Sequence, residues 1–302
     1  MELGIVGLGR MGFGMTVRLL EGGHRVVAFN RSEGPRLRIA KHGADTVPSL
    51  EELVDRLAAP RIVWLMLPAG DVTETHLTKL ADLLLPGDMM VDGANSYYKD
   101  TIRRATLFCA KGLDFVDVGV SGGVWGLLEG YSMMVGGEAQ AVERLCPVLE
   151  TLALGPALGW GHVGTHGAGH FAKMVHNGIE YGMMEAYAEG FALLHAKTEF
   201  SLDPNQIARI WQHGSVIRSW LLDLIERSLA QDPTLDKVIG QVPDSGEGRW
   251  AVLEGLEQNV SLPVITLSLL RRIRSREEAP FGDKLLAVLR EQFGGHEVQR
   301  RE

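Results

Sequence analysis

The chain has 302 residues, of which 45% are hydrophobic and 23% charged, which is typical of a soluble globular protein with room for two domain cores. Its formal net charge of −8 disfavours non-specific binding to nucleic acid but is compatible with a local basic pocket for an anionic metabolite. Cys109 and Cys146 form no CxxC or His–Cys cluster, so we expect neither a disulfide framework nor a metal site. Without a signal peptide or an apolar run of roughly 20 residues, the expected location is the cytoplasm, away from membranes.

A glycine-rich turn follows the first apolar segment. The pattern predicts a strand over residues 3–6, a helix that continues to Leu20, and a second strand over 25–29. Strand, glycines, helix and strand within about 30 residues are typical of a dinucleotide-binding unit, in which the phosphates lie on the helix N-terminus. The cofactor-binding candidates of this turn are Gly7, Leu8, Gly9, Arg10, Met11 and Gly12.

The residues that close the second strand bear on the choice between NAD and NADP. An acid at this point binds the ribose 2′-hydroxyl of NAD, but the chain has Asn30 there. The guanidinium of Arg31 can hold a 2′-phosphate, and Ser32 adds a hydroxyl donor. These residues favour NADP, while Glu33, which can reach a ribose hydroxyl, leaves NAD as the alternative.

Further strands are predicted over 62–67, 89–92 and 114–118, alternating with helices over 49–58, 72–84 and 99–111. This alternation indicates a doubly wound α/β sheet, a Rossmann-type domain over residues 1–165. Ligands of such sheets bind beyond the carboxyl ends of the strands, although each loop there can also be an ordinary turn. The candidate residues in these loops are Leu67, Pro68, Ala69, Asn95, Ser121, Gly122 and Gly123.

Helical periodicity dominates from about Gly167 onward. Helices are predicted over 168–196, 204–229, 249–258, 263–275 and 280–293, so the fold class is α/β with an all-α C-terminal domain over 166–302 for substrate binding and oligomerisation. The segment 231–248, rich in proline, glycine and acids, is a loop long enough to act as a lid, or it is a simple connection.

The helix over 168–196 carries a polar stripe. At about 100° per residue, Lys173, His176, Asn177 and Glu180 fall within an arc of roughly 100°, opposite a set of apolar residues and glycines. We expect one face for chemistry and the other for packing. Each of Gly178 and Gly182 costs about 1 kcal/mol in a helix interior, which indicates close approach of another backbone or a ligand. The apolar face consists of Phe171, Met174, Val175, Gly178, Ile179 and Gly182.

Two basic segments follow in this acidic chain. Arg271, Arg272, Arg274 and Arg276 form either a solvated helix face paired with neighbouring glutamates or a site for phosphate or carboxylate. Near the C-terminus, Arg290 and His296 flank paired glycines that are expected to end the last helix; a frayed tail is the alternative.

Taken together, these residues resemble the decarboxylating 6-phosphogluconate dehydrogenase family in its short bacterial and archaeal form. The helix segment from Lys173 to Tyr181 resembles the family's catalytic helix, and Arg290 with His296 resembles the tail that reaches a neighbouring subunit's site. Asp92 to Ser96 and Ser121 to Gly123 are similar to its substrate loops, and Asn30 to Ser32 to its NADP-selecting motif. The resemblance covers nearly the whole chain.

The resemblance implies oxidative decarboxylation of 6-phosphogluconate to ribulose 5-phosphate with reduction of NADP, or alternatively NAD, and without a metal. Lys173 would take the 3-hydroxyl proton and Glu180 would protonate C1 of the enediol, with His176 and Asn177 as positioning groups. A homodimer or homotetramer is implied, and the pathway, pentose phosphate or gluconate catabolism, stays open. The implied substrate residues are Asn95, Ser121, Gly122, Gly123, Tyr181, Arg249, Arg272 and, from a partner subunit, Arg290 and His296.

The chain departs from the long family forms at three points. Pro68 stands where they carry a lysine, which weakens the NADP assignment, and Ser245 to Ala251 reads Ser-Gly-Glu-Gly-Arg-Trp-Ala where they read Lys-Gly-Thr-Gly-Lys-Trp-Thr. A second helical repeat is missing, so we expect subunit exchange to complete the helical core.

Two other functions compete with this interpretation. A 3-hydroxyacid dehydrogenase acting on 3-hydroxyisobutyrate or tartronate semialdehyde would share the nucleotide domain and Lys173 but would not need Glu180 as a general acid. A non-catalytic NADP-sensing protein on the same fold is the second alternative, disfavoured by the presence of both residues.

Overall fold

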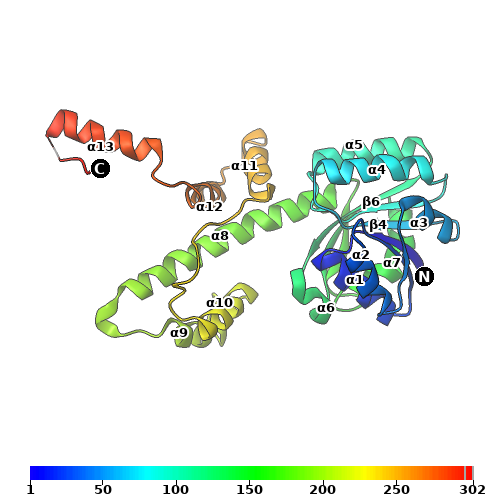
Figure 1. Cartoon of the computed structure of the whole chain (residues 1–302), viewed down its shortest axis with the longest axis horizontal. Coiled ribbons are helices and arrows are strands. Elements are labelled where there is room, and N and C mark those ends of the chain that lie inside the picture. Colours follow the sequence, from blue (N-terminus) through cyan, green and yellow to red (C-terminus); the bar gives the residue numbers. More distant parts are fainter. Residues whose placement is uncertain (296, 301–302) are drawn as a thin grey trace. The chain divides into compact units, whose positions relative to one another are not determined.

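A computed structural model describes residues 1–295 and 297–300 of the chain, which forms two compact units, Met1–His176 and Asn177–Glu302 (Figure 1). The helix α8 (Ala168–Ala196) begins in the first unit and ends in the second, exactly over the predicted range.

The first unit is built on an eight-stranded sheet in the order β3-β2-β1-β4-β5-β6-β7-β8. All neighbouring strands are parallel except β6 and β7, which are antiparallel. The predicted doubly wound α/β class is confirmed, although β3, β7 and β8 were not predicted. The strands are β1 (Glu2–Val6), β2 (Arg25–Phe29), β3 (Asp45–Val47), β4 (Ile62–Leu65), β5 (Met89–Asp92), β6 (Asp114–Ser121), β7 (Ser132–Gly137) and β8 (Trp160–Gly164).

Helices cover both faces of this sheet. On one face Met15 of α1 and Leu145 of α7 belong to one buried apolar cluster, and Leu53 of α3, Leu77 of α4 and Phe108 of α5 belong to the other. Parallel strands packed on both faces have near-continuous apolar sequences, as the central strands do here. The helices of the unit before α8 are α1 (Arg10–Glu21), α2 (Glu33–Ala40), α3 (Leu50–Arg56), α4 (Asp71–Leu83), α5 (Tyr98–Ala110), η1 (Gly123–Trp125), α6 (Gly126–Glu129) and α7 (Ala139–Leu152).

The parallel run β1-β4-β5-β6 determines where the candidate loops lie. Because β1 pairs with β4, β4 with β5 and β5 with β6, all in parallel, the carboxyl ends of the four strands share one edge of the sheet. The loops that leave this edge begin at Gly7, Met66, Gly93 and Gly122. The predicted cofactor and substrate loops of the first unit therefore lie side by side.

The second unit is helical throughout the residues that the structure describes. The single helix predicted over 204–229 is wrong: Gly214 adopts φ +86°, and Ser219 begins a new helix by accepting a hydrogen bond from the Leu222 amide (3.1 Å). A glycine in the left-handed region ends a helix, and a serine N-cap starts the next. After α8 follow η2 (Thr198–Phe200), α9 (Pro204–Gln212), α10 (Trp220–Gln231), α11 (Glu247–Glu257), α12 (Pro263–Arg274) and α13 (Phe281–Gly294).

The paired glycines end the last helix as predicted. Gly295 caps α13 in the left-handed conformation, with φ 64°. His296, which follows it, lies outside the described residues. Within 1–295 and 297–300, no helix combines the length and the apolar character that crossing a membrane requires.

Candidate active site

The glycine-rich turn after β1 has the geometry that binds a pyrophosphate. Gly7 has φ +103°, and a Cβ there would lie 2.3 Å from the Met66 carbonyl oxygen, while a Cβ on Gly12 would lie 2.1 Å from the Gly7 carbonyl oxygen. A Cβ on Gly9 would meet no atom within 4 Å, and this residue caps α1 without a side-chain hydrogen bond. The first amides of α1, beginning at Arg10 and Met11, therefore face open space, as a dinucleotide requires.

Asn30 is tied to this turn. Its Oδ1 accepts a hydrogen bond from the Leu8 amide (3.0 Å), and its Nδ2 donates to the Ser32 carbonyl (3.1 Å). Arg31 and Ser32 are exposed beside it, and α2 begins at the next residue. The amide of Asn30 thus holds the turn together, whereas the groups available to select a cofactor are those of Arg31 and Ser32.

The loop after β4 is compact. Thr73 Oγ1 donates to the Pro68 carbonyl (2.9 Å), which closes the chain onto the first turn of α4. Leu67 is half-buried and packs against the core, while Pro68 and Ala69 are exposed. The loop therefore offers an apolar wall beside the glycine-rich turn.

A buried ion network supports the loop after β5. Asp92 accepts hydrogen bonds from the Ala94 amide (3.1 Å) and from Ser96 Oγ (3.0 Å), and Arg104 bonds to Asp92 Oδ2 (3.2 Å). Arg104 also contacts Glu74 (2.8 Å), whose pKa is lowered to about 2, first by hydrogen bonding to Arg103. Asn95 is exposed between these buried neighbours, so the network presents its side chain to solvent.

Lys173 lies over strand β6. It is only 8% exposed, and its Nζ is 3.4 Å from His176 Nδ1. A Cβ on Gly119 would lie 2.4 Å from Lys173 Cβ, so the glycine makes room for this side chain. Two residues further along β6, Ser121 is half-buried at the strand end, followed by Gly122 (φ +123°) and Gly123 (φ +55°).

The predicted division of α8 into a chemical and a packing face is partly wrong. On the polar stripe Lys173 and Asn177 are buried, with His176 and Glu180 half-buried, whereas on the apolar side Ile179 is 54% exposed. Phe171 and Val175 are exposed too, while Met174, Gly178 and Gly182 are buried. The polar stripe packs against other parts of the chain, whereas Phe171, Val175 and Ile179 on the apolar side are exposed to solvent.

The glycines of α8 have neighbours other than those predicted. A Cβ on Gly178 would lie 3.2 Å from Ile265 Cδ1, and one on Gly182 would lie 3.1 Å from Val264 Cγ1. The groups that approach are thus side chains of α12 and, at Gly178, also the side chain of Ala251 of α11 (3.3 Å), rather than another backbone.

Tyr181 and Arg272 form a second polar centre. The Arg272 guanidinium stacks on the Tyr181 ring at 3.5 Å from its centroid, and Arg272 Nη1 donates to the Pro243 carbonyl (3.1 Å). Tyr181 is 4% exposed, and its hydroxyl is buried with no hydrogen-bond partner among the described residues. A buried hydroxyl without a partner costs about 1–3 kcal/mol, so a bound acceptor here would stabilise the protein.

Arg249 lies next to this centre. A Cβ on the preceding residue of the helix, Gly248, would lie 2.5 Å from Tyr181 Cε2, so α11 packs tightly on that ring. Arg249 Nε donates to Asp244 Oδ2 (2.5 Å), and Asp244 also accepts from the Gly246 amide (3.1 Å). Asp244 therefore ties the loop before α11 to the first turn of that helix, in which Arg249 directly follows the glycine that packs on Tyr181.

The arginines of α12 have different surroundings. Arg271 pairs with Glu185 (3.0 Å) and Arg274 with Glu277 (3.2 Å), as in a solvated helix face. Only Arg272 turns toward Tyr181. Arg290 is exposed on α13.

Sequence reasoning missed two supporting carboxylates, Asp117 and Asp244. Asp117 is fully buried in β6 and bonds to the start of α8. An acid inside an otherwise apolar strand is a signal for such a role because a buried charge needs partners. Asp244 was visible as the acid before a glycine in the predicted loop.

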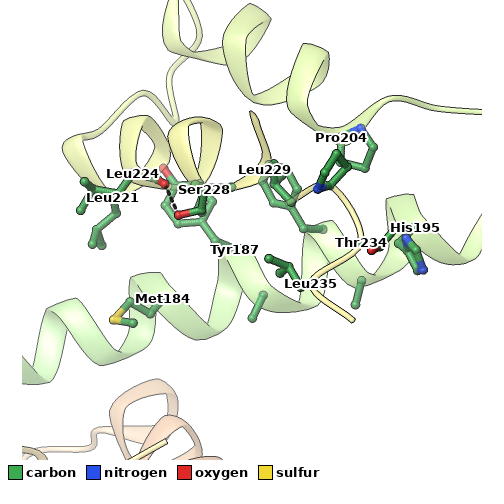
Figure 2. Close-up of a pocket in the computed structure, with 15 residues that line it drawn as sticks. Met184, Tyr187, His195, Pro204, Leu221, Leu224, Ser228, Leu229, Thr234 and Leu235 are labelled. Carbon is green, nitrogen blue, oxygen red and sulfur yellow. Dashed lines mark hydrogen bonds between the residues drawn. The ribbon is translucent and has the colours of Figure 1, made fainter. Parts of the chain in front are cut away.

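One cavity of the second unit has no candidate residue in its wall. It has a volume of about 580 Å³ and is formed by the second half of α8, by α10 and by the loop after α10 (Figure 2). Apolar side chains such as Met184, Leu224 and Leu235 dominate its wall, and none of the candidate residues lines it. No group of three or more metal-binding side chains occurs among residues 1–295 and 297–300.

Comparison with known proteins agrees with this geometry. Residues 2–164 match the family model described as the NAD binding domain of 6-phosphogluconate dehydrogenase, and residues 169–280 match its C-terminal domain. A Haloferax volcanii protein named 6-phosphogluconate dehydrogenase, NAD(+)-dependent, decarboxylating, is 44% identical over 303 residues, which are 100% of both chains.

Solved structures give the same result. Plasmodium falciparum 6-phosphogluconate dehydrogenase superposes with a TM-score of 0.83 at 26% identity, covering 100% of this chain and 67% of that one. Mycobacterium tuberculosis 3-hydroxyisobutyrate dehydrogenase shares the fold, with a TM-score of 0.71 at 24% identity over 88% of this chain and 90% of that one. The chain is therefore an oxidoreductase with an NAD-binding domain and belongs to the 6-phosphogluconate dehydrogenase family.

Proposed function

We propose that the chain converts 6-phospho-D-gluconate to D-ribulose 5-phosphate and CO2 with reduction of NAD(P)+. The observation that carries this proposal is the buried Tyr181 hydroxyl, which lacks a partner under the Arg272 guanidinium. A phosphate oxygen would supply the missing acceptor and the charge that Arg272 can pair with. An unphosphorylated 3-hydroxy acid would leave both groups unused, which disfavours the 3-hydroxyisobutyrate-type alternative.

The acid and the base stand on one helix. Lys173 and Glu180 are two turns apart on α8, about 10 Å along its axis, and long side chains at this spacing can reach opposite ends of a short sugar acid. Tyr181 directly follows Glu180, so a phosphate at Tyr181 and a 3-hydroxyl at Lys173 fit a substrate that runs along the helix. Asn95, Ser121, His176 and Asn177 would bind its carboxylate and hydroxyls.

Lys173 carries the first proton transfer. A nicotinamide bound at the glycine-rich turn would supply the hydride acceptor for C3, and Lys173 in its neutral form would take the proton of the 3-hydroxyl. The product is a β-keto acid, whose ketone accepts the electron pair released when the C1 carboxylate leaves as CO2. Protonated Lys173 stabilises the resulting oxyanion, and Glu180 donates a proton to the enediol carbon. In each of these steps the residues of the chain would position the substrate or transfer a proton.

The proposed cofactor is NADP. Arg31 is exposed next to the turn that Asn30 holds, where its guanidinium can pair with a 2′-phosphate. The Haloferax volcanii relative is named as NAD(+)-dependent, which makes NAD the specific alternative. Residues 1–165 would bind this cofactor, and residues 166–302, together with Asn95 and Ser121 of the first domain, would bind the sugar acid.

We also propose a homodimer or homotetramer in which a partner subunit contributes Arg290 and His296. Apolar side chains of α13 are exposed in the single chain, among them Phe281 at 77% and Leu286 at 63%. Such a surface is typical of an interface. The chain also spans 67% of the longer Plasmodium falciparum enzyme, which is consistent with a helical repeat supplied by a second copy.

The first experiment is a turnover assay with 6-phosphogluconate in parallel with NADP+ and NAD+, following reduced-nicotinamide absorbance and CO2 in the same samples. Equal yields of reduced cofactor and CO2 support the reaction. Faster turnover with NADP+ supports the role of Arg31, whereas faster turnover with NAD+ contradicts it. Absence of turnover with either cofactor rejects 6-phosphogluconate and makes 3-hydroxyisobutyrate the next substrate to assay.

Lys173→Met tests the base. We expect kcat to fall by about 10³–10⁴-fold because the general base is removed. Lys79→Met is the control, since Lys79 lies at the surface, where it pairs with Glu51 (2.7 Å). Full activity of Lys173→Met would assign proton transfer to another group.

Arg272→Lys tests the phosphate centre, with Arg271→Lys as the matched neighbour on the same helix. The first change removes the planar guanidinium stacked on Tyr181, and we expect the KM for 6-phosphogluconate to rise about 10–100-fold. The second alters a pair with Glu185 and should leave the KM unchanged. Equal effects of both changes would remove the phosphate assignment.

A further inference from the structure

A single buried carboxylate joins strand β6 to the start of α8. Asp117 is 0% exposed; its Oδ1 accepts a hydrogen bond from the Gly167 amide (2.7 Å) and its Oδ2 accepts one from the His170 amide (2.9 Å). Gly167 directly precedes α8, and His170 lies in its first turn, whose amides have no acceptors within the helix. A negative charge at this end also interacts favourably with the helix dipole. Asp117 thus caps the helix from a neighbouring strand.

Two glycines let the backbone pack closely around the Asp117 carboxylate. A Cβ on Gly136 of β7 would lie 2.6 Å from Asp117 Oδ1, and a Cβ on Gly169 would lie 2.4 Å from the Met134 carbonyl oxygen. Gly169 would also meet the Asp117 carbonyl oxygen at 2.7 Å. Backbone lies against backbone here, so α8 has no room to slide or rotate on the sheet while the cap is intact.

The same face of β6 carries three successive parts of the site. Residues at alternate positions of a strand point to one side, which places Asp117, Gly119 and Ser121 in a row. Asp117 fixes the start of α8, Gly119 lies under Lys173 Cβ (2.4 Å from its own ideal Cβ), and Ser121 ends the strand. One strand therefore determines where the base stands relative to a substrate-binding serine.

We infer that Asp117 is a positioning residue, which holds the first turn of α8 so that Lys173 meets the 3-hydroxyl of the substrate. The inference rests on the proposed function for the role of Lys173, but the capping contact does not. Loss of the cap would displace the base without removing any group that binds the sugar acid or the cofactor. It should therefore lower kcat far more than it raises KM.

Asp117→Asn is the test variant because its size is unchanged. The amide oxygen can still accept one of the two hydrogen bonds, but the NH2 group faces the other amide donor. The matched control is Asp88→Asn. Asp88 is also buried (1% exposed) and accepts hydrogen bonds from the Arg61 amide (2.7 Å) and the Leu85 amide (2.9 Å), but it precedes β5, at the opposite end of the strand from the loop of Asn95.

The expected result has two parts. In Asp117→Asn, kcat falls about 10²-fold while the KM for 6-phosphogluconate stays within about three-fold, because a displacement of the order of 1 Å is enough for such a loss. Hydrogen exchange becomes faster in peptides covering 166–176. In Asp88→Asn the thermal midpoint falls, but kcat and exchange in 166–176 stay close to those of the unchanged chain.

The inference is overturned if Asp117→Asn keeps the kcat and the slow hydrogen exchange of the unchanged chain. It is also overturned if Asp88→Asn lowers kcat as much as Asp117→Asn does when the two variants lose the same amount in thermal midpoint. Should Asp117→Asn fail to fold, Gly119→Ala decides, since it keeps Asp117 while its Cβ would press on Lys173 Cβ (2.4 Å) and on the Gly169 carbonyl oxygen (2.7 Å): a normal kcat in that variant counts against β6 as the element that places the base. If the unchanged chain does not turn over 6-phosphogluconate, the proposed function fails, while the exchange comparison still tests the cap.

Discussion

The two units of the chain differ in how fully they bury their apolar side chains. In Met1–His176 the central strands are buried on both faces, and charged groups such as Asp92 and Arg104 are buried together. In Asn177–Glu302 long apolar side chains of α12 and α13 are exposed, and the buried Tyr181 hydroxyl lacks a partner among the described residues. The first unit thus holds an apolar core of its own, whereas the second exposes apolar side chains that a further copy of the chain could cover.

The largest expected effect tests this contrast by shortening one apolar side chain in each unit to alanine. Leu53→Ala removes a fully buried side chain of α3 and should lower the free energy of unfolding by about 2–5 kcal/mol at any protein concentration. Leu286→Ala, at a position 63% exposed on α13, should leave that value unchanged in dilute solution but weaken self-association. Thermal unfolding and sedimentation over a range of concentrations measure both. Self-association of Leu286→Ala as strong as that of the unchanged chain would mean that Leu286 of α13 does not lie in an interface.

A smaller effect sharpens the contrast at one hydroxyl. Tyr181→Phe removes a group without a partner, so we expect no loss of stability without ligand, but a KM for 6-phosphogluconate raised about ten-fold or more. Tyr187→Phe is the control on the same helix, because its hydroxyl bonds to the Ile217 carbonyl and to Ser219 Oγ (2.9 Å). It should lower stability by about 1 kcal/mol and leave the KM unchanged. The reverse pattern in urea unfolding and kinetics would contradict the phosphate assignment.

The smallest effect concerns the ion network of the first unit. Glu74 has its pKa lowered from 4.5 to about 2, first by hydrogen bonding to Arg103. A lowered pKa in the folded state stabilises the fold above the unfolded value, and this contribution is lost as pH falls from about 4.5 toward about 2. Because the Glu74 side chain is 38% exposed, the contribution is below about 1 kcal/mol.

Glu74→Gln should therefore be slightly less stable than the unchanged chain at pH 7, with the difference shrinking below pH about 4.5. Urea unfolding at several pH values measures the difference. Glu21→Gln, at an exposed position at the end of α1, is the control. If the difference in the free energy of unfolding between Glu74→Gln and the unchanged chain grows as the pH falls, the fold does not stabilise Glu74 in its charged form.

Local patterns predicted the first unit and the helix α8 well. The glycine-rich turn, β2, β5 and the full range of α8 follow from short-range periodicity and turn chemistry. β7 and β8 were missed because their glycines and polar residues hide the strand pattern, and the break at Gly214 was missed because one glycine in an amphipathic stretch is a weak stop signal.

The site was predictable as a set of residues, not as an arrangement. Lys173 and Glu180 are spaced on one helix, so periodicity is enough to relate them. The stacking of Arg272 on Tyr181 and the contact of Asp117 with the start of α8 join residues far apart in the sequence, and no local pattern encodes them. Burial of Lys173 likewise depends on Gly119, whose role appears only once the strand and the helix meet.

The bond between Asn30 and the Leu8 amide limits how cofactor preference can be altered by protein engineering. An acid at position 30 is the obvious exchange to favour NAD, but it would replace the amide that bonds to both Leu8 and Ser32. Arg31 is exposed and has no part in those two bonds, so it can be exchanged without disturbing the turn. The proposed choice of cofactor and the integrity of the glycine-rich turn thus depend on adjacent residues, of which only Asn30 makes the bonds that hold the turn.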